Sequence, residues 1–252
     1  MTTADLIAAL DLPPGARVDR RVPKTLLVEH GAPTAADKRR INEGIEQVQW
    51  VATLKPTTIG VPALRDEVRE YLEIAVLSVT LRAEAKTERL AELIHRAVPY
   101  QVFLLVAEGS RLKLSLAHKR WSQGEAGATV LDGEPVSATL TDAEPGALHG
   151  SFHEALSLAR QPRADLYLLY QGWVDTLLAL LAARVTGRFA VATSPAQAAT
   201  RREALRECAR LDTEIARLRS VAAKEKQVPR QVALNLELKR AEAARAEALT
   251  RL

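Results

Sequence analysis

The chain has very little cysteine and no glycine-rich phosphate loop. Cys208 is the one cysteine among 252 residues, which excludes an internal disulfide and a cysteine-rich zinc site. It stands on an apolar helical stripe, and we interpret it as a small buried hydrophobic residue. Neither GxxxxGK[ST] nor GxGxxG occurs, so nucleotide binding of those types is not expected.

Targeting features are also missing from the sequence. Residues 1–5 carry no basic start followed by a long apolar run, as a signal peptide would. The apolar run Leu177–Ala183 is too short to cross a bilayer. We therefore expect a cytoplasmic protein with no membrane partner.

Aromatic residues are scarce and unevenly placed. They make up 4% of the chain, and all ten lie between Trp50 and Phe189, so the packed body is expected there. Residues 200–252 contain 13 Lys/Arg and 8 Asp/Glu, a net charge of +5, whereas the rest contains 22 and 23, a net charge of −1. A basic excess of this kind is usually a solvated helix face, or else a surface for phosphates or an acidic partner.

The last part of the chain has the period of two helices. Ser194-Pro195 suits a helix start, and Pro229 cannot stand inside one continuous helix. We expect helices over 195–224 and 229–251, folded as an antiparallel hairpin. The first has a single apolar stripe at spacings of three and four, formed by Leu205, Cys208, Leu211, Ile215, Leu218 and Ala222.

Two nearly continuous apolar runs, Leu72–Leu81 and Val102–Ala107, are typical of strands buried on both faces. Between them, Lys86–Ala97 has a helical period. Strand, helix and strand at this spacing predict a parallel βαβ unit.

The remaining elements follow from alternation, capping residues and turns. Leu112–Leu116 alternates with polar residues and predicts a half-exposed antiparallel strand. Asp132-Gly133 predicts a β-hairpin between strands 129–131 and 135–140. Further strands are expected at 24–28, 47–54 and 59–61, and helices at 3–10, 35–45, 148–159 and 166–186. The fold class is α+β: a mixed-sheet body over 1–192 with flanking helices, then a coiled-coil-like hairpin over 193–252.

Two residues are candidates for catalysis. Glu73 adjoins a buried strand, as the acids of metal nucleases do, but Ala75 stands where a lysine would be expected. His95 lies at a helix end, where it would hydrogen-bond the last carbonyls or act as an acid or base. His149 and His153 are four apart, without a His-Glu-x-x-His pattern. We expect no metal site and no cofactor.

One short cluster combines cations with an aromatic ring. Lys119, Arg120 and Trp121 are adjacent, and nucleic acid is bound by phosphate contacts together with stacking. The alternative interpretation makes Trp121 an anchor at the edge of the core.

The second tail helix carries apolar groups on more than one side. Val232 and Leu236 lie on one side, and Leu234 and Leu238 lie on another. Asn235 stands among them and would set helix register or receive a partner's backbone. Pairing within the hairpin covers only part of this set, so we expect these five residues to bind a partner.

Several stretches together resemble an uncharacterised bacterial family of proteins of about this length, a domain of unknown function. They span the chain in consistent order: Val22–Lys24, Ala36–Lys38, Ile45–Trp50, Lys55–Ile59, Glu70–Ile74, Ile94–Tyr100, Lys224–Gln227 and Val232–Lys239. The sequence departs from the family pattern at Ala52-Thr53 and at Pro229. The resemblance implies genes beside helicases and DNA methyltransferases of restriction or phage-defence type, and no catalytic residue.

These observations lead to three functional hypotheses. The first is a non-catalytic accessory or scaffold subunit of a DNA-modification or phage-defence system, docking a helicase or methyltransferase partner through the tail helices. The tail would otherwise join copies of the chain into a homo-oligomer. The second is a metal-dependent nuclease using Glu73. The third is direct DNA binding through the basic tail.

Overall fold

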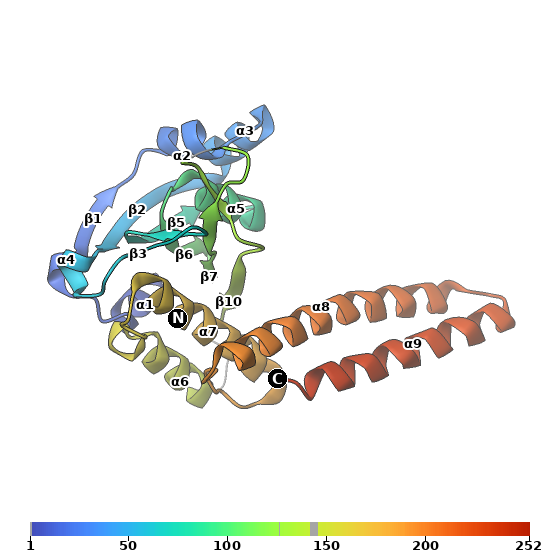
Figure 1. Cartoon of the computed structure of the whole chain (residues 1–252). Helices are drawn as coiled ribbons and strands as arrows, with labels where there is room; N and C mark the ends of the chain where they lie inside the picture. Colours follow the sequence, from blue (N-terminus) through green and yellow to red (C-terminus); the bar gives the residue numbers. More distant parts are fainter. Residues whose placement is uncertain (1, 126, 142–145) are drawn as a thin grey trace. The chain divides into compact units, whose positions relative to one another are not determined.

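The computed structural model of the chain describes residues 2–125, 127–141 and 146–252 (Figure 1). Contacts divide the chain into two units, one ending at Leu177 and one beginning at Leu178. This division falls inside a continuous helix and does not mark where an independently folding domain ends. The expected boundary between residues 192 and 193 therefore stays a prediction.

A six-stranded mixed sheet forms the centre of the first unit. Its spatial order is β1 (Arg17–Arg21), β2 (Ile45–Leu54), β5 (Ile74–Leu81), β6 (Gln101–Glu108), β7 (Arg111–Leu116) and β10 (Val136–Leu140). Strands β5 and β6 are parallel and joined by helix α5 (Thr87–Ala97). The other neighbouring pairs are antiparallel. The α+β class and the βαβ unit are confirmed.

Two small sheets accompany the large one. Strands β3 (Leu64–Arg65) and β4 (Glu70–Tyr71) form one, and β8 (Lys119–Trp121) and β9 (Thr129–Leu131) form the other. The predicted hairpin between 129–131 and 135–140 is wrong, because β9 pairs with β8 whereas β10 pairs with β7. Gly133 does turn the chain, with φ of 84°, but the turn leads from one sheet into another.

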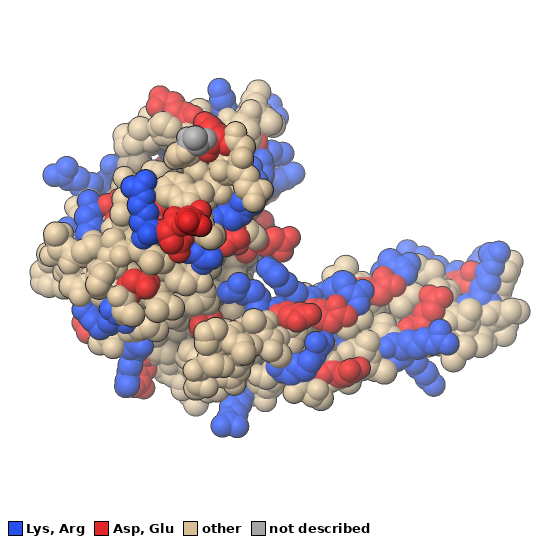
Figure 2. Space-filling model, in the orientation of Figure 1, with Lys and Arg blue, Asp and Glu red and all other residues tan. Residues whose placement is uncertain are grey.

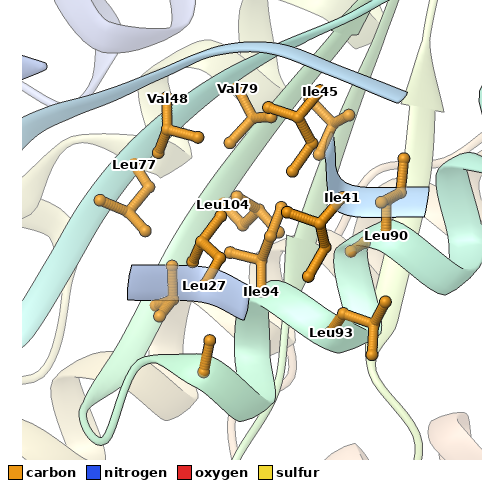
Figure 3. Packing of buried hydrophobic residues seen from close by; sticks show 14 of the residues in the cluster. Leu27, Ile41, Ile45, Val48, Leu77, Val79, Leu90, Leu93, Ile94 and Leu104 are labelled. Carbon is orange, nitrogen blue, oxygen red and sulfur yellow. The ribbon is translucent and has the colours of Figure 1, made fainter. Parts of the chain in front are cut away.

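One face of the large sheet is covered by α2 (Lys24–Gly31), α3 (Ala35–Gly44) and α5. Thr34 caps α3 by accepting a hydrogen bond from the backbone N–H of Asp37. Apolar side chains of the three helices meet those of β2, β5 and β6 (Figure 3). The labelled set is Leu27, Ile41, Ile45, Val48, Leu77, Val79, Leu90, Leu93, Ile94 and Leu104.

Residues 24–28 were expected to form a strand, and this was wrong. They begin α2, in which Leu27 and Gly31 are buried one helical turn apart. A Cβ on Gly31 would lie 2.6 Å from the Cβ of Ala97, so glycine permits close packing of α2 on α5. Packing against α5 therefore decided the conformation of a segment whose local pattern was ambiguous.

Two smaller expectations also failed. Residues 59–61 do not form a strand: α4 (Pro56–Ile59) is a single helical turn that Gly60 ends with φ of 65°. Strand β7 is buried on both faces rather than half-exposed. Helix α5 lies over its polar face, where Lys113 pairs with Glu88 and Ser115 contacts His95.

The opposite face of the sheet receives the first half of α7 (Leu166–Thr186), which belongs to the same unit. Trp173 packs edge-on against Phe103 with ring centroids 5.1 Å apart. The Tyr170 hydroxyl donates to Val102 O and accepts from Ala117 N, both at 2.8 Å. Helices α1 (Thr3–Ala9) and α6 (Gly146–Leu156) and the short 3-10 turns Pro14–Ala16 and Leu158–Arg160 complete this unit.

Among the described residues, α7 alone has the length and apolar composition to cross a membrane. Of its most apolar window, 72% is buried within the fold. Core helices of soluble proteins pass the same test of length and composition. The helix therefore gives no argument for or against a membrane.

The C-terminal unit contains a long helical hairpin. Helix α8 (Pro195–Lys224) begins at Ser194, whose hydroxyl accepts from Gln197 N, and α9 (Val228–Leu249) returns alongside it. These bounds match the expected helices closely. Leu211, Ile215, Leu218 and Ala241 form the hairpin core. Arg219 pairs across the hairpin with Glu242 at 2.7 Å.

Candidate functional site

Glu73, the candidate nuclease acid, lies at the start of β5 and is bound by a lysine. Its Oε2 is 2.8 Å from Lys55 Nζ, and this pairing raises the pKa of Lys55. Within the described residues no three His, Cys, Asp or Glu side chains are grouped as metal ligands would be. The carboxylate of Asp66 instead accepts from the N–H groups of Val68 and Arg69. Glu73 and Asp66 thus stabilise local structure through an ion pair and through hydrogen bonds to the backbone.

His95 is completely buried in α5. Its Nε2 lies 3.0 Å from the Ser115 hydroxyl, and Nδ1 has no hydrogen-bond partner within the described part of the chain. Burial, with a smaller contribution from the charge of Lys119, lowers the pKa of His95 to about 3. The imidazole is therefore neutral at physiological pH and is a very weak base. It contacts a strand hydroxyl rather than the last helix carbonyls.

The side chains of the three adjacent residues of β8, Lys119, Arg120 and Trp121, lie in different environments. Lys119 is buried and donates to Val98 O, and burial lowers its pKa to about 7. Arg120 lies 3.8 Å from an Asp132 carboxylate oxygen. The Trp121 indole N–H donates to Asp66 O at 3.0 Å. The structure does not bring the three together as one exposed nucleic-acid surface, and Trp121 anchors the β3–β4 turn.

A pocket of about 740 Å³ lies beside α5 at the β7–β10 edge of the sheet. Lys113 and Ser115 line it, and both are buried. This volume suits a small molecule. The cations around it are already paired, since Lys113 contacts Glu88 and Arg96 contacts Glu92. The lining therefore selects no single class of ligand.

The five residues expected to bind a partner separate into two groups on α9. Leu234 and Leu238 are half-buried and pack on the hairpin core. Val232 and Leu236 are both 53% exposed, and Asn235 is exposed. The surface that remains open to a partner is thus the side of α9 opposite to α8.

The open side of α9 is apolar over about two helical turns. Val228, Val232 and Leu236 follow one another at intervals of four residues, with exposed fractions of 67%, 53% and 53%. Residues four apart lie on one face of a helix. We call this row the α9 stripe. Large aliphatic side chains so exposed and so aligned are uncommon on a surface with no partner.

Cations gather around the α9 stripe. From Arg219 to Arg240 the chain has six Lys/Arg and two Asp/Glu, which makes a net charge of +4. Figure 2 shows that blue and red atoms alternate along the hairpin, and several of its cations are paired. No ion pair occurs in the described structure for Lys224, Lys226, Arg230, Lys239 and Arg240. The end of the hairpin therefore combines apolar surface with unpaired positive charge.

The fold and this surface define an α+β protein with a basic, partly apolar helical hairpin at its C-terminal end. Residues 10–244 match the family model described as Domain of unknown function (DUF4391). The match covers most of the chain, and the protein belongs to this family. No match was found among curated proteins or among solved structures.

Proposed function

We propose that the protein is a non-catalytic accessory or scaffold subunit that docks a partner protein through its C-terminal hairpin. The α9 stripe carries this proposal. Burial of an exposed Val or Leu contributes roughly 1.5–3 kcal/mol, and three such residues aligned on one helix suit helix-in-groove recognition. Leu234 and Leu238 on the other side of α9 hold the helix in place on α8.

We further propose that the partner is a helicase or DNA methyltransferase of a bacterial DNA-modification or phage-defence system. Support comes from the family resemblance and the gene neighbourhood that it implies. A cytoplasmic location follows from such a role. The buried, lysine-paired Glu73 and the neutral buried His95 fit a subunit without catalysis of its own.

Co-purification from the native host tests the proposal. The full chain carries an affinity tag and is compared with the double variant Val232→Glu/Leu236→Glu. We expect a helicase or methyltransferase to co-purify in fixed ratio with the unaltered chain and to be lost from the variant. A charged side chain on the stripe cannot enter an apolar groove without a large desolvation cost.

A matched control separates the stripe from a general effect of charge. Ala233 and Ala244 are exposed on α9 and are eleven residues apart, so they share a lateral face. Ala233→Glu/Ala244→Glu should retain the partner. Loss of the partner in both double variants, or in neither, contradicts docking through the stripe.

Direct DNA binding is the second candidate, favoured by the unpaired cations of the hairpin end. Because acidic residues are interleaved along the rest of the hairpin, we expect binding to duplex DNA to be weak and to fall steeply with salt. Titration at two salt concentrations measures it. Nanomolar affinity that survives physiological salt would favour a dedicated DNA site over a docking subunit.

No arrangement of side chains in the described structure favours the nuclease hypothesis. The corresponding test is nonetheless simple. Purified protein with Mg²⁺ or Mn²⁺ should leave DNA and RNA intact. Cleavage that Glu73→Gln abolishes would overturn the non-catalytic role.

A further inference from the structure

We infer that the occupant of the α9 stripe is an acidic amphipathic helix of the partner protein, packed along α9 as the third helix of a bundle. This inference rests on the proposed docking function and adds the chemistry of the docked segment. It follows from the shape of the stripe and from the charges at its two ends.

The stripe has the shape that a helix requires. Val228 and Leu236 are eight residues apart, which is about 12 Å along the helix axis at 1.5 Å per residue. A straight apolar row of this length matches two to three turns of a second helix with apolar residues at spacings of three and four. Leu238 and Ala241 on the opposite side of α9 already face α8. Helix α9 would thus lie between two helices.

Both ends of the stripe carry cations. Lys224 and Lys226 lie in and beside the turn before Val228. Lys239 and Arg240 follow Leu236, and Lys239 lies in line with the stripe because eleven residues separate it from Val228. A docked helix that carries Asp or Glu beside its apolar row would place carboxylates next to these cations. Complementary charges of this kind set the choice of partner at helix seams.

A second copy of the chain fits this surface poorly. Two hairpins joined through their stripes would bring together two segments that each carry a net charge of +4. Like charges brought closer together than about 8 Å, the Debye length at physiological salt, are little screened from one another. Like charges at such an interface oppose association. Charge therefore favours an acidic partner over self-association.

Synthetic peptides provide the test with the full-length protein. Three peptides of about 20 residues contain the same number of leucines, which stand at helical spacing in the first two only. The first has Glu at the flanking positions, the second has Gln there, and the third is a scrambled form of the Glu peptide. Fluorescence anisotropy measures the affinity of each for the unaltered chain and for its variants.

We expect the Glu peptide to bind at least about tenfold more tightly than the Gln and scrambled peptides at moderate salt. Val232→Glu/Leu236→Glu should weaken its binding by about tenfold or more, as should Lys226→Glu/Lys239→Glu. Ala233→Glu/Ala244→Glu should not. Melting curves and circular dichroism verify that each variant is folded.

Several outcomes overturn the inference. Equal binding of the Glu and Gln peptides shows that acidity is not recognised, and equal binding of the scrambled peptide shows that no apolar seam is recognised. Self-association of the unaltered chain that Val232→Glu/Leu236→Glu abolishes identifies a second copy as the occupant. In the remaining case, Val232→Glu/Leu236→Glu abolishes co-purification of the native partner while the Glu peptide binds no more tightly than the Gln peptide. That result refutes the acidic helix and leaves the docking function standing.

Discussion

The first unit, which we call the sheet unit, and the C-terminal hairpin differ in whether their ion pairs are buried or lie at the surface. In the sheet unit Asp37 is buried and accepts hydrogen bonds from Arg89 and Arg40. The Arg89 guanidinium holds the pKa of this carboxyl well below its usual range. In the hairpin, Glu207 and Glu214 pair at the surface with an arginine three residues further on.

This difference shows which part of the molecule depends on its polar contacts. A buried polar group that loses its partner keeps the desolvation cost, whereas a surface ion pair that is lost is replaced by water. The sheet unit should therefore be sensitive to single polar substitutions. The hairpin should tolerate substitutions at its surface ion pairs, which leaves its surface free to be adapted to a partner.

At neutral pH the largest effect is expected at Tyr170, whose hydroxyl bonds to two buried backbone groups. Tyr170→Phe leaves Val102 O and Ala117 N without this partner, which we expect to destabilise the fold by about 2–4 kcal/mol. Urea unfolding measures the change.

Tyr167→Phe is the matched control. Within the described structure the Tyr167 ring meets the Arg69 guanidinium at 4.4 Å, and phenylalanine keeps this contact. We expect a change of less than about 0.5 kcal/mol. Similar losses for the two variants would show that the buried hydroxyl network does not set the stability of this unit.

The next effect concerns pH and His95. The pKa of His95 is lowered from 6.5 to about 3 in the fold, so as pH falls below 6.5 the unfolded chain takes up a proton that the folded chain does not. The free energy of unfolding should fall by up to about 1.4 kcal/mol per pH unit because of this group, with the loss complete near pH 3.

His95→Gln removes the titration and keeps a donor toward Ser115. Its free energy of unfolding should fall less steeply between pH 6.5 and 4 than that of the unaltered chain. His30→Gln, at an exposed position on α2, is the matched control for a histidine that is not buried. Parallel pH profiles for the unaltered chain and His95→Gln would argue against a neutral buried imidazole.

The smallest effect is expected in the hairpin. Glu214→Gln breaks the surface pair with Arg217, and exposed pairs of this type contribute little. We expect no measurable shift in the melting temperature. A clear loss of stability would show that the hairpin depends on its ion pairs as the sheet unit depends on its buried contacts.

Long periodic segments were predictable because their pattern repeats over many residues. The apolar runs of β5 and β6, the α5 period and both tail helices appear where the sequence placed them. Short segments were not. Segment 24–28 became helical because contacts with α5 outweighed weak local preference, and segment 59–61 holds the end of α4 and the Gly60 turn in place of a strand. Pairing of β9 with β8 depends on residues distant in sequence.

The buried polar contacts were also beyond sequence reasoning. Lys113 and Ser115 alternate with leucines and so resembled the exposed side of a strand. Helix α5 covers them because it crosses above β7, and that crossing is a property of the packed layers. The alternation of polar and apolar residues along a strand shows which residues share a face of the sheet. It does not show whether another layer covers that face.

Helix α9 shows most clearly what the sequence determined and what the tertiary structure determined. Helical period alone places Val232 and Leu236 on one side and Leu234 and Leu238 on another. Both pairs are apolar, so the sequence could not decide which pair faces α8. The hairpin core includes Leu234 and Leu238, because only one side of a helix can meet a given neighbour. Tertiary packing thereby left Val232 and Leu236 exposed beside the cations of the hairpin end.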